Sequence, residues 1–245
     1  MNNGTVAWHD VECASYEADL PLWRELAGAQ PGPVLELGCG TGRVALDLAA
    51  RGHRVTALDS DAELVEEAAR RARRRGLRLE AVIADARSFS LPQRFALVLA
   101  PMQVFQLLGG ERGRLRALRC VHGQLAPGGL LAVALANPFA AVPAGRAEPP
   151  LPDVREEQGW VLSSRPLAIR EEGGAVVVER LRQSVSPKGE IEEELHEVKL
   201  DELDPETLEA EAMEAGLRPA GRRQIPETRA HVGSTVVLLR EGAAP

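Results

Sequence analysis

A short run of strand-forming residues that stops at three glycines constrains the fold of this chain more than any other feature. Val34 to Leu37 forms the run, glycine recurs at 38, 40 and 42, and a helical pattern begins at Arg43. A strand, a glycine turn and a helix in this order open the nucleotide pocket of a doubly wound α/β sheet. Glycine permits positive φ and close approach of a ligand, and the amides at the helix start favour an anionic group.

The spacing of the glycines separates two kinds of nucleotide site. The dinucleotide fingerprint G-x-G-x-x-G needs glycine at position 43, which is arginine here. The pattern instead reads E-x-G-x-G-x-G, and it resembles the first motif of the class I S-adenosylmethionine-dependent methyltransferases. In that family the glycines pass under the methionine part of the cofactor, and the acid orders the loop and helps hold the amino end. The alternative is a bare glycine-rich turn in an unrelated α/β protein. The resemblance implies these cofactor-binding residues: Glu36, Gly38, Cys39, Gly40 and Gly42.

An acid follows the second predicted strand, which covers Arg54 to Leu58. Asp59 lies about 20 residues past the first glycine, where a carboxylate accepts hydrogen bonds from ribose hydroxyls. The alternative is that Asp59 only begins a turn. Ser60 and Glu63 form a predicted capping box, with Ser60 as the N-cap of the next helix. We count Ser60 with the residues predicted to bind the cofactor.

The third and fourth predicted strands end at further candidate positions. Leu77 to Ala84 ends at Asp85-Ala86, which resembles the second motif of the family. There the acid accepts from the adenine amino group and the small neighbour lines the ring; the alternative for Asp85 is a loop acid. Phe95 to Ala100 is fully apolar, as expected in a buried parallel sheet. In the family this strand tip, here Ala100, faces the transferred methyl group.

The segment 101–108 lacks the motifs of several methyltransferase classes. It has no Asn/Asp-Pro-Pro-Tyr/Phe, no Pro-Cys and no acid of the metal-dependent type, and it is similar to small-molecule N- and O-methyltransferases. Gln103 and Gln106 either hydrogen-bond the substrate or act as capping and packing residues. Tyr16 lies in a helical lead-in predicted over residues 8–28. It is either a packing residue or, as the resemblance implies, a cover over the cofactor.

The rest of the chain predicts how the sheet is completed. A helix over Leu115 to Leu125, a turn at Pro127-Gly128-Gly129 and a strand over Leu130 to Ala136 come first, and a proline-rich linker follows at 138–152. Three runs separated by glycine-bearing turns then predict an antiparallel meander: Trp160 to Arg170, Ala175 to Ser186 and Glu190 to Leu200. Asp204-Pro205 starts a last helix, and two strands close the chain: Leu217 to Arg223 and Val232 to Arg240.

These elements predict a doubly wound, Rossmann-like α/β fold. We expect a mostly parallel seven-stranded sheet with an antiparallel closing strand, and an antiparallel β insertion after the fifth strand. Residues 1–137 form the N-terminal helix and the cofactor-binding core, and 201–245 return to that core. Residues 138–200 form the linker and insertion, which either covers the substrate or makes a homodimer contact.

The charge and composition of the chain limit the kinds of partner that it is expected to bind. The 245 residues carry a net charge of −7, which argues against a chain that mainly neutralises phosphates. The arginine run 70–75 suits the negative end of a helix. No apolar run reaches the roughly 18 residues of a membrane span, and the first ten residues have no signal pattern. Three distant cysteines indicate neither disulfides nor a metal site. We expect a cytoplasmic protein with no nucleic-acid or membrane partner.

The resemblance implies a cofactor, S-adenosylmethionine, and methyl transfer to nitrogen or oxygen of a small molecule. An amine needs only to arrive unprotonated, whereas a hydroxyl needs a general base. We assign no catalytic residue, because a surface or structural role suits each candidate histidine better: His9, His122, His196 and His231. One alternative is a non-catalytic S-adenosylmethionine-binding or scaffold protein on the same fold. Aminopropyl transfer would need paired acids beyond the fourth strand, and 100–108 contains none.

Overall fold

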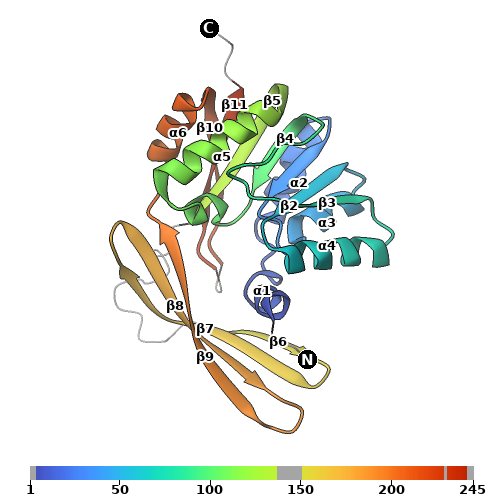
Figure 1. The fold of residues 1–245 in the computed structure, drawn as a ribbon, viewed down its shortest axis with the longest axis vertical. Helices are drawn as coiled ribbons and strands as arrows, with labels where there is room; N and C mark the ends of the chain where they lie inside the picture. The colour runs from blue at the N-terminus through green and yellow to red at the C-terminus, as the bar shows by residue number, and fades with distance from the viewer. Residues whose placement is uncertain (1–3, 137–150, 229–230, 242–245) are drawn as a thin grey trace.

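A computed structural model describes residues 4–136, 151–228 and 231–241. It contains a seven-stranded sheet with helices on both faces and a separate four-stranded antiparallel sheet (Figure 1). The predicted Rossmann-like fold with an antiparallel insertion is therefore confirmed. Residues 138–150 of the predicted proline-rich linker lie outside the described residues.

The large sheet has the strand order β10-β11-β5-β4-β1-β2-β3. The pairs among β1 to β5 are parallel, and β11 runs antiparallel to both of its neighbours. The central β1 is buried along its whole length, which explains its almost unbroken apolar sequence. The strands are β1 (Val34–Leu37), β2 (Val55–Asp59), β3 (Leu79–Ile83), β4 (Phe95–Ala100), β5 (Leu125–Ala136), β10 (Leu217–Ile225) and β11 (Ser234–Glu241).

Two apolar clusters lie on the two faces of this sheet. Side chains alternate along β4, so Leu97 and Leu99 join one cluster and Val98 joins the other. The first cluster includes residues of α2, α3 and α4, and the second includes residues of η1, α5 and α6 (Figure 1). The helices are α1 (Thr5–Cys13), α2 (Leu20–Ala29), α3 (Arg43–Ala50), α4 (Ala62–Arg74), η1 (Val104–Leu107), α5 (Gly110–Gln124) and α6 (Pro205–Glu214).

The insertion is a sheet of order β6-β7-β8-β9. It forms the lower part of Figure 1, with α1 between one end of it and the core, and Asp201 at the end of β9 pairs with Arg114 of α5 at 3.2 Å. A small cluster of Trp8 and Val11 from α1 with Leu162 from β7 joins the helix to one face of the sheet. The strands are β6 (Asp153–Glu157), β7 (Trp160–Glu171), β8 (Ala175–Val185) and β9 (Ile191–Asp201).

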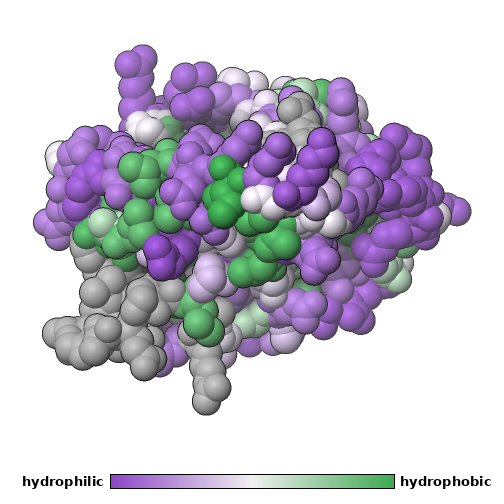
Figure 2. Space-filling view, turned by 90° about the horizontal axis from the view of Figure 1, so that it is seen from below, coloured by the Kyte–Doolittle hydropathy of each residue, from purple (hydrophilic) through white to green (hydrophobic). Residues whose placement is uncertain are grey.

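The opposite face of the insertion sheet carries exposed apolar side chains. Val161, Val185 and Ile191 are cross-strand neighbours in the register. Figure 2 views the molecule from the side of the insertion sheet, and it shows apolar side chains gathered among hydrophilic ones. Val154 and Leu195 are 59% and 62% exposed. The homodimer contact predicted for this segment has a surface of suitable chemistry, and it stays a prediction.

Several local predictions need correction. The lead-in is two helices, α1 and α2, because a turn at 14–19 interrupts the pattern. Helix α5 begins at Gly110 rather than Leu115. The predicted turn at 127–129 lies within β5, whose register against β4 shifts between Phe95 and Leu97. The insertion has a fourth strand, β6, whose charged sequence gave no strand signal. None of the described helices is long and apolar enough to cross a membrane.

Candidate functional site

The glycine loop, residues 38–42, lies between the end of β1 and the start of α3. Gly38, Gly40 and Gly42 have φ of 64°, 53° and 89°, the left-handed region that other residues avoid. A Cβ at Gly38 would lie 2.5 Å from a methyl carbon of Val104 in η1. The loop backbone therefore requires glycine both for its turn and for its packing against η1.

Glu36 lies under this loop and is 2% exposed. Its Oε2 atom has no hydrogen-bond partner among the described residues, which is unusual for a buried carboxylate. Burial raises the pKa of Glu36 from 4.5 to about 8, although nearby Arg43 acts in the opposite direction. An unpartnered buried carboxyl oxygen fits a cationic ligand group.

Asp59, at the end of β2, fastens the glycine loop. Its carboxylate accepts the backbone N–H of Gly40 at 2.8 Å and that of Asp61 at 3.0 Å. The backbone N–H of Cys39 donates to the Leu58 carbonyl at 3.0 Å. Cys39 is buried, and burial raises the pKa of its thiol. The loop is thus held to the tip of the neighbouring strand.

The predicted cap of α4 is wrong by one residue. Asp61 is the N-cap, and its Oδ1 accepts the N–H groups of Glu63 and Leu64 at 2.9 and 3.2 Å. Ser60 is exposed and does not cap the helix. The physical reason is that Asp59 holds the N–H of Asp61, which places the carboxylate of Asp61, and not the Ser60 hydroxyl, over the first turn.

Asp85 follows β3 at the same edge of the sheet. Its carboxylate accepts from the Arg87 guanidinium at 2.7 and 2.9 Å and from the Arg87 backbone N–H at 2.8 Å. This pairing holds the pKa of Asp85 below its usual value. Ala86 is buried beside it, and Ala100 at the tip of β4 is buried as well. The parallel topology therefore brings Glu36, Asp59 and Asp85 to one edge.

Helix α1 lies across the glycine loop, a relationship that the sequence analysis missed. A Cβ at Gly40 would overlap the His9 ring. The nitrogen Nδ1 of His9 lies 3.5 Å from Oγ1 of Thr41, and Thr41 donates to Asp10 at 2.8 Å. Burial lowers the pKa of His9. Asp10 gave no sequence signal because its partners are distant in the chain.

Tyr16 lies beside the start of α3. Its ring meets His231 edge-on at 4.8 Å, and the Arg43 guanidinium lies 5.2 Å from the ring centre. Arg43 also forms a bidentate pair with buried Asp19 at 2.6 and 2.7 Å. The arginine that replaces the third dinucleotide glycine thus has a packing role. The predicted contact of Tyr16 with the cofactor stays a prediction.

The two glutamines after β4 have different environments. Gln106 is 3% exposed, and its amide exchanges two hydrogen bonds of 3.0 Å with the backbone of Ala136. Of the two interpretations left open, this geometry supports packing for Gln106. Gln103 is half-buried and precedes η1. The preceding Met102 has φ of 56°, a strained value of the kind that collects at functional sites.

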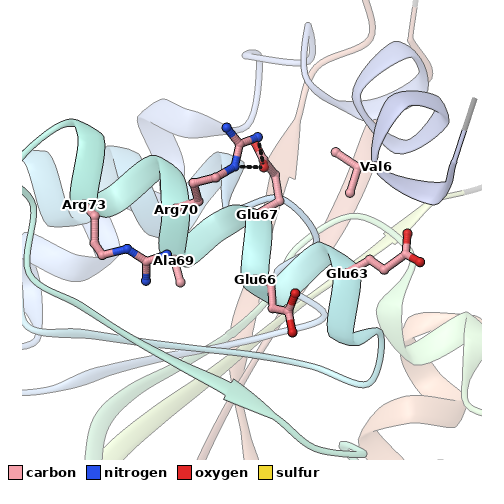
Figure 3. Close-up of a pocket in the computed structure, with 7 residues that line it drawn as sticks. All are labelled: Val6, Glu63, Glu66, Glu67, Ala69, Arg70 and Arg73. Atoms are coloured by element: carbon pink, nitrogen blue, oxygen red, sulfur yellow. Dashed lines mark hydrogen bonds and ion pairs between the residues drawn. The ribbon is translucent and has the colours of Figure 1, made fainter. Parts of the chain in front are cut away.

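Open hollows of about 410 and 510 Å³ lie elsewhere on the surface. The first is formed by Val6 and the outer side of α4, where Arg70 turns back to pair with Glu67 (Figure 3). No glycine-loop residue lines either hollow. The glycine loop, where buried polar groups converge, therefore remains the candidate site in preference to these hollows. Within the described ranges, no three His, Cys, Asp or Glu side chains are placed to hold a metal ion.

The comparison with protein families gives one match, a methyltransferase domain over residues 34–129. This range contains β1 to β4 and the whole edge described above. A comparison with curated protein sequences returned no match.

Solved methyltransferase structures share the fold over nearly the whole chain, CcbJ, KedS8 and CalS10 among them. The methyltransferase CcbJ from Streptomyces caelestis is 22% identical, with a TM-score of 0.72 and coverage of 99% of this chain and 100% of that one. The sugar N-methyltransferase KedS8 from Streptoalloteichus is 18% identical, with a TM-score of 0.73 and coverage of 97% of this chain and 91% of that one. The amino pentose methyltransferase CalS10 from Micromonospora echinaspora is 22% identical, with a TM-score of 0.71 and coverage of 96% of this chain and 95% of that one. Residues 34–129 thus match a methyltransferase domain, and the chain shares the fold of these methyltransferase structures over nearly its whole length.

Proposed function

We propose that this protein transfers the methyl group of S-adenosylmethionine to a nitrogen or oxygen of a small molecule. The observation that carries the proposal is the unpartnered Oε2 of Glu36 beneath the glycine loop. The cofactor supplies a methyl group already activated on a sulfonium. The chain's own task is to bind and orient it, to align the nucleophile and to exclude water.

Each strand tip has a role in this proposal. Glu36 receives the cationic amino end, and Gly38, Cys39, Gly40 and Gly42 let the ligand approach the backbone. Asp59 accepts from the ribose hydroxyls beside its two backbone donors, since an ionised carboxylate has about four lone-pair sites. Asp85 and Ala86 receive the adenine, and Ala100 faces the methyl group. Ser60 and Tyr16 complete the predicted set at its edge.

An amine is the first acceptor to test. Amines need no general base once unprotonated, and the tip of β4 continues as Ala100, Pro101 and Met102, which offer none. The names of two structural neighbours, a sugar N-methyltransferase and an amino pentose methyltransferase, point to the same chemistry. Gln103, half-buried beyond β4, is our candidate for contact with the acceptor.

The insertion forms the acceptor side in this proposal. Residues 1–137 and 201–245 make the cofactor-binding core, and 138–200 cover it. In support, the sheet of β6 to β9 meets α1 at one end and η1 and α5 of the core at the other (Figure 1). A cover of this kind would exclude water from the transferring methyl group.

Calorimetric titration with S-adenosylmethionine and S-adenosylhomocysteine, with NAD as control, tests the cofactor assignment. Methyl transfer is then measured by mass spectrometry on amino sugars first and phenols second. A product heavier by one methylene unit supports the proposal. Binding of both sulfur compounds without transfer to any acceptor would favour the non-catalytic alternative, and binding of NAD alone would contradict the proposal.

A further inference from the structure

Asp10 of α1 is a buried carboxylate at a junction of four elements. It is 4% exposed. It accepts from Thr41 in the glycine loop at 2.8 Å and from Arg71 of α4, whose Nη1 lies 3.0 Å from Oδ1. Nη1 of Arg155, in β6, lies 2.6 Å from Oδ2. Asp10 therefore joins the glycine loop to the insertion sheet.

The link to the loop runs through Thr41. Thr41 is 1% exposed and stands between Gly40 and Gly42, two residues with left-handed backbones. The glycines leave the loop backbone free to move, so a side chain fixed between them limits that freedom. The hydrogen bond from Thr41 to Asp10 is thus a restraint on the part of the chain that meets the cofactor.

The link to the insertion runs through Arg155 and a second anchor. Glu12, two residues after Asp10, accepts from Arg182 of β8 at 2.8 and 3.0 Å and from Ser164 of β7 at 2.8 Å. Together with the apolar cluster at Trp8, these contacts fasten α1 to the insertion sheet. A displacement of the sheet would therefore reach Asp10 directly.

The charges around Asp10 make the junction sensitive to the loss of one partner. A buried carboxylate is tolerated when cations and donors surround it, and removing one partner leaves an uncompensated charge. Hydrogen bonds from Arg71 and Thr41 and the charge of Arg155 outweigh burial and hold the pKa of Asp10 below its usual value. The carboxylate is ionised at neutral pH and depends on all three partners.

We propose that Asp10 is a positioning residue through which the insertion sheet sets the affinity of the glycine loop for S-adenosylmethionine. Arg155 orients Asp10, Asp10 orients Thr41, and Thr41 fixes the loop. The acceptor side of the molecule is thereby coupled to the cofactor side. The inference needs only cofactor binding and does not depend on which acceptor is methylated.

The test is a double-mutant cycle on the dissociation constant of S-adenosylhomocysteine, measured by calorimetry. Arg155→Met and Thr41→Val are made singly and together. Each single variant should bind about threefold to thirtyfold more weakly, the range for residues along a packed network. The double variant should lose little more affinity than the single variant that binds more weakly, because both substitutions break the same chain of contacts.

Glu157→Gln is the matched control. Glu157 is the other partner of Arg155, at 2.9 Å, so this variant disturbs the arginine without touching Asp10. It should bind as the wild type does, and Arg155→Lys should recover part of the lost affinity. Hydrogen exchange at the amides of 38–42 should accelerate in Arg155→Met and remain unchanged in Glu157→Gln.

Two results would overturn the inference: wild-type affinity in Arg155→Met, or fully additive losses in the double variant. If Arg155→Met does not fold, Asp10→Asn replaces it in the cycle, because the amide keeps one acceptor for Thr41. Titration of the wild type with S-adenosylhomocysteine comes first. Absence of binding there would count against the proposed function. Normal binding by the wild type, with unchanged affinity in Arg155→Met, would count against the coupling alone.

Discussion

The backbone N–H of Gly40 donates to the Asp59 carboxylate at 2.8 Å. One side chain at the end of β2 thereby braces a loop that follows β1. The brace uses one carboxylate oxygen, and the N–H of Asp61 uses the other. Each ionised carboxylate oxygen has two lone-pair sites. A residue proposed to bind ribose is therefore also part of the structure that shapes its own site.

Asp59→Ala should weaken the binding of S-adenosylhomocysteine by about 1.5–3 kcal/mol, the worth of hydrogen bonds to a charged group. Calorimetric titration measures this loss directly. Glu214→Gln is a suitable control, because it breaks an exposed ion pair with Arg119 on the far helices. Unchanged affinity in Asp59→Ala would remove the ribose assignment.

Gln106→Leu should destabilise the fold without acting on the cofactor. The substitution leaves the N–H and C=O of Ala136 without their side-chain partner. An unsatisfied buried group costs about 1–3 kcal/mol, and 1 kcal/mol shifts the melting temperature of a domain of this size by about 2–4 °C. Thermal unfolding followed by circular dichroism gives the measurement.

Gln103→Leu is the matched control for Gln106→Leu. Gln103 is half-buried and its side chain does not cap η1, so Gln103→Leu should cost less stability than Gln106→Leu. If Gln103 contacts the acceptor, this variant raises KM for the acceptor while it melts like the wild type. Equal melting temperatures for the two variants would contradict the packing role of Gln106.

Glu36 should make the ligand-free protein less stable as pH rises. Its pKa is about 8 in the fold against an ordinary 4.5. Between these values the native state keeps a proton that the unfolded chain releases, so the free energy of unfolding falls with pH across this window. Glu36→Gln removes the titration and should flatten the profile. Urea denaturation midpoints at a series of pH values give the comparison.

Asp85→Asn should change the pH dependence of the free energy of unfolding in the opposite direction, in the same experiment. Pairing with Arg87 lowers the pKa of Asp85 below 3.8. Its contribution to stability is present above that ordinary value and is lost as pH falls through the lowered pKa. Asp85→Asn should therefore be less stable than the wild type above about pH 4 and converge with it at lower pH, whereas Glu36→Gln should gain stability relative to the wild type as the pH rises toward about 8. Parallel profiles for the wild type and Glu36→Gln would contradict the raised pKa of Glu36.

The sheet and its edge were predictable because they depend on local signals. Apolar runs such as Phe95 to Ala100 mark buried parallel strands, and glycine spacing marks the turn after β1. The parallel topology then brings the acids at 36, 59 and 85 together without any further information. Signals of this kind need only a few neighbouring residues.

The packing of α1 against the glycine loop and the insertion was not predictable, because its contacts join residues that are distant in the sequence. Asp10 meets Arg155 of the insertion, and His9 meets Gly40. No periodicity marks such pairs. The cap of α4 failed for a related reason: Ser60 fits the capping pattern, but a hydrogen bond from Asp61 to Asp59 moves the cap to the next residue.

Gly40→Ala should be costly for two separable reasons. Gly40 has φ of 53°, and a left-handed conformation costs other residues about 1–2 kcal/mol. Its new Cβ would also overlap the His9 ring. Gly52→Ala is the matched control, because Gly52 has φ of 88° and no heavy atom within 4 Å of an added Cβ. Gly52→Ala should show the backbone cost alone.

The cost of the overlap with His9 is measured separately by making Gly40→Ala in a second chain, one that also carries His9→Ala. In a His9→Ala chain, Gly40→Ala should cost about as much as Gly52→Ala, since only the backbone strain remains. In the wild-type chain it should cost clearly more, as measured by urea denaturation. An equal cost in both backgrounds would mean that α1 yields to the added methyl group. It would then be a loose cover, whereas a His9-dependent cost means that α1 is held firmly against the loop through its contacts with the insertion.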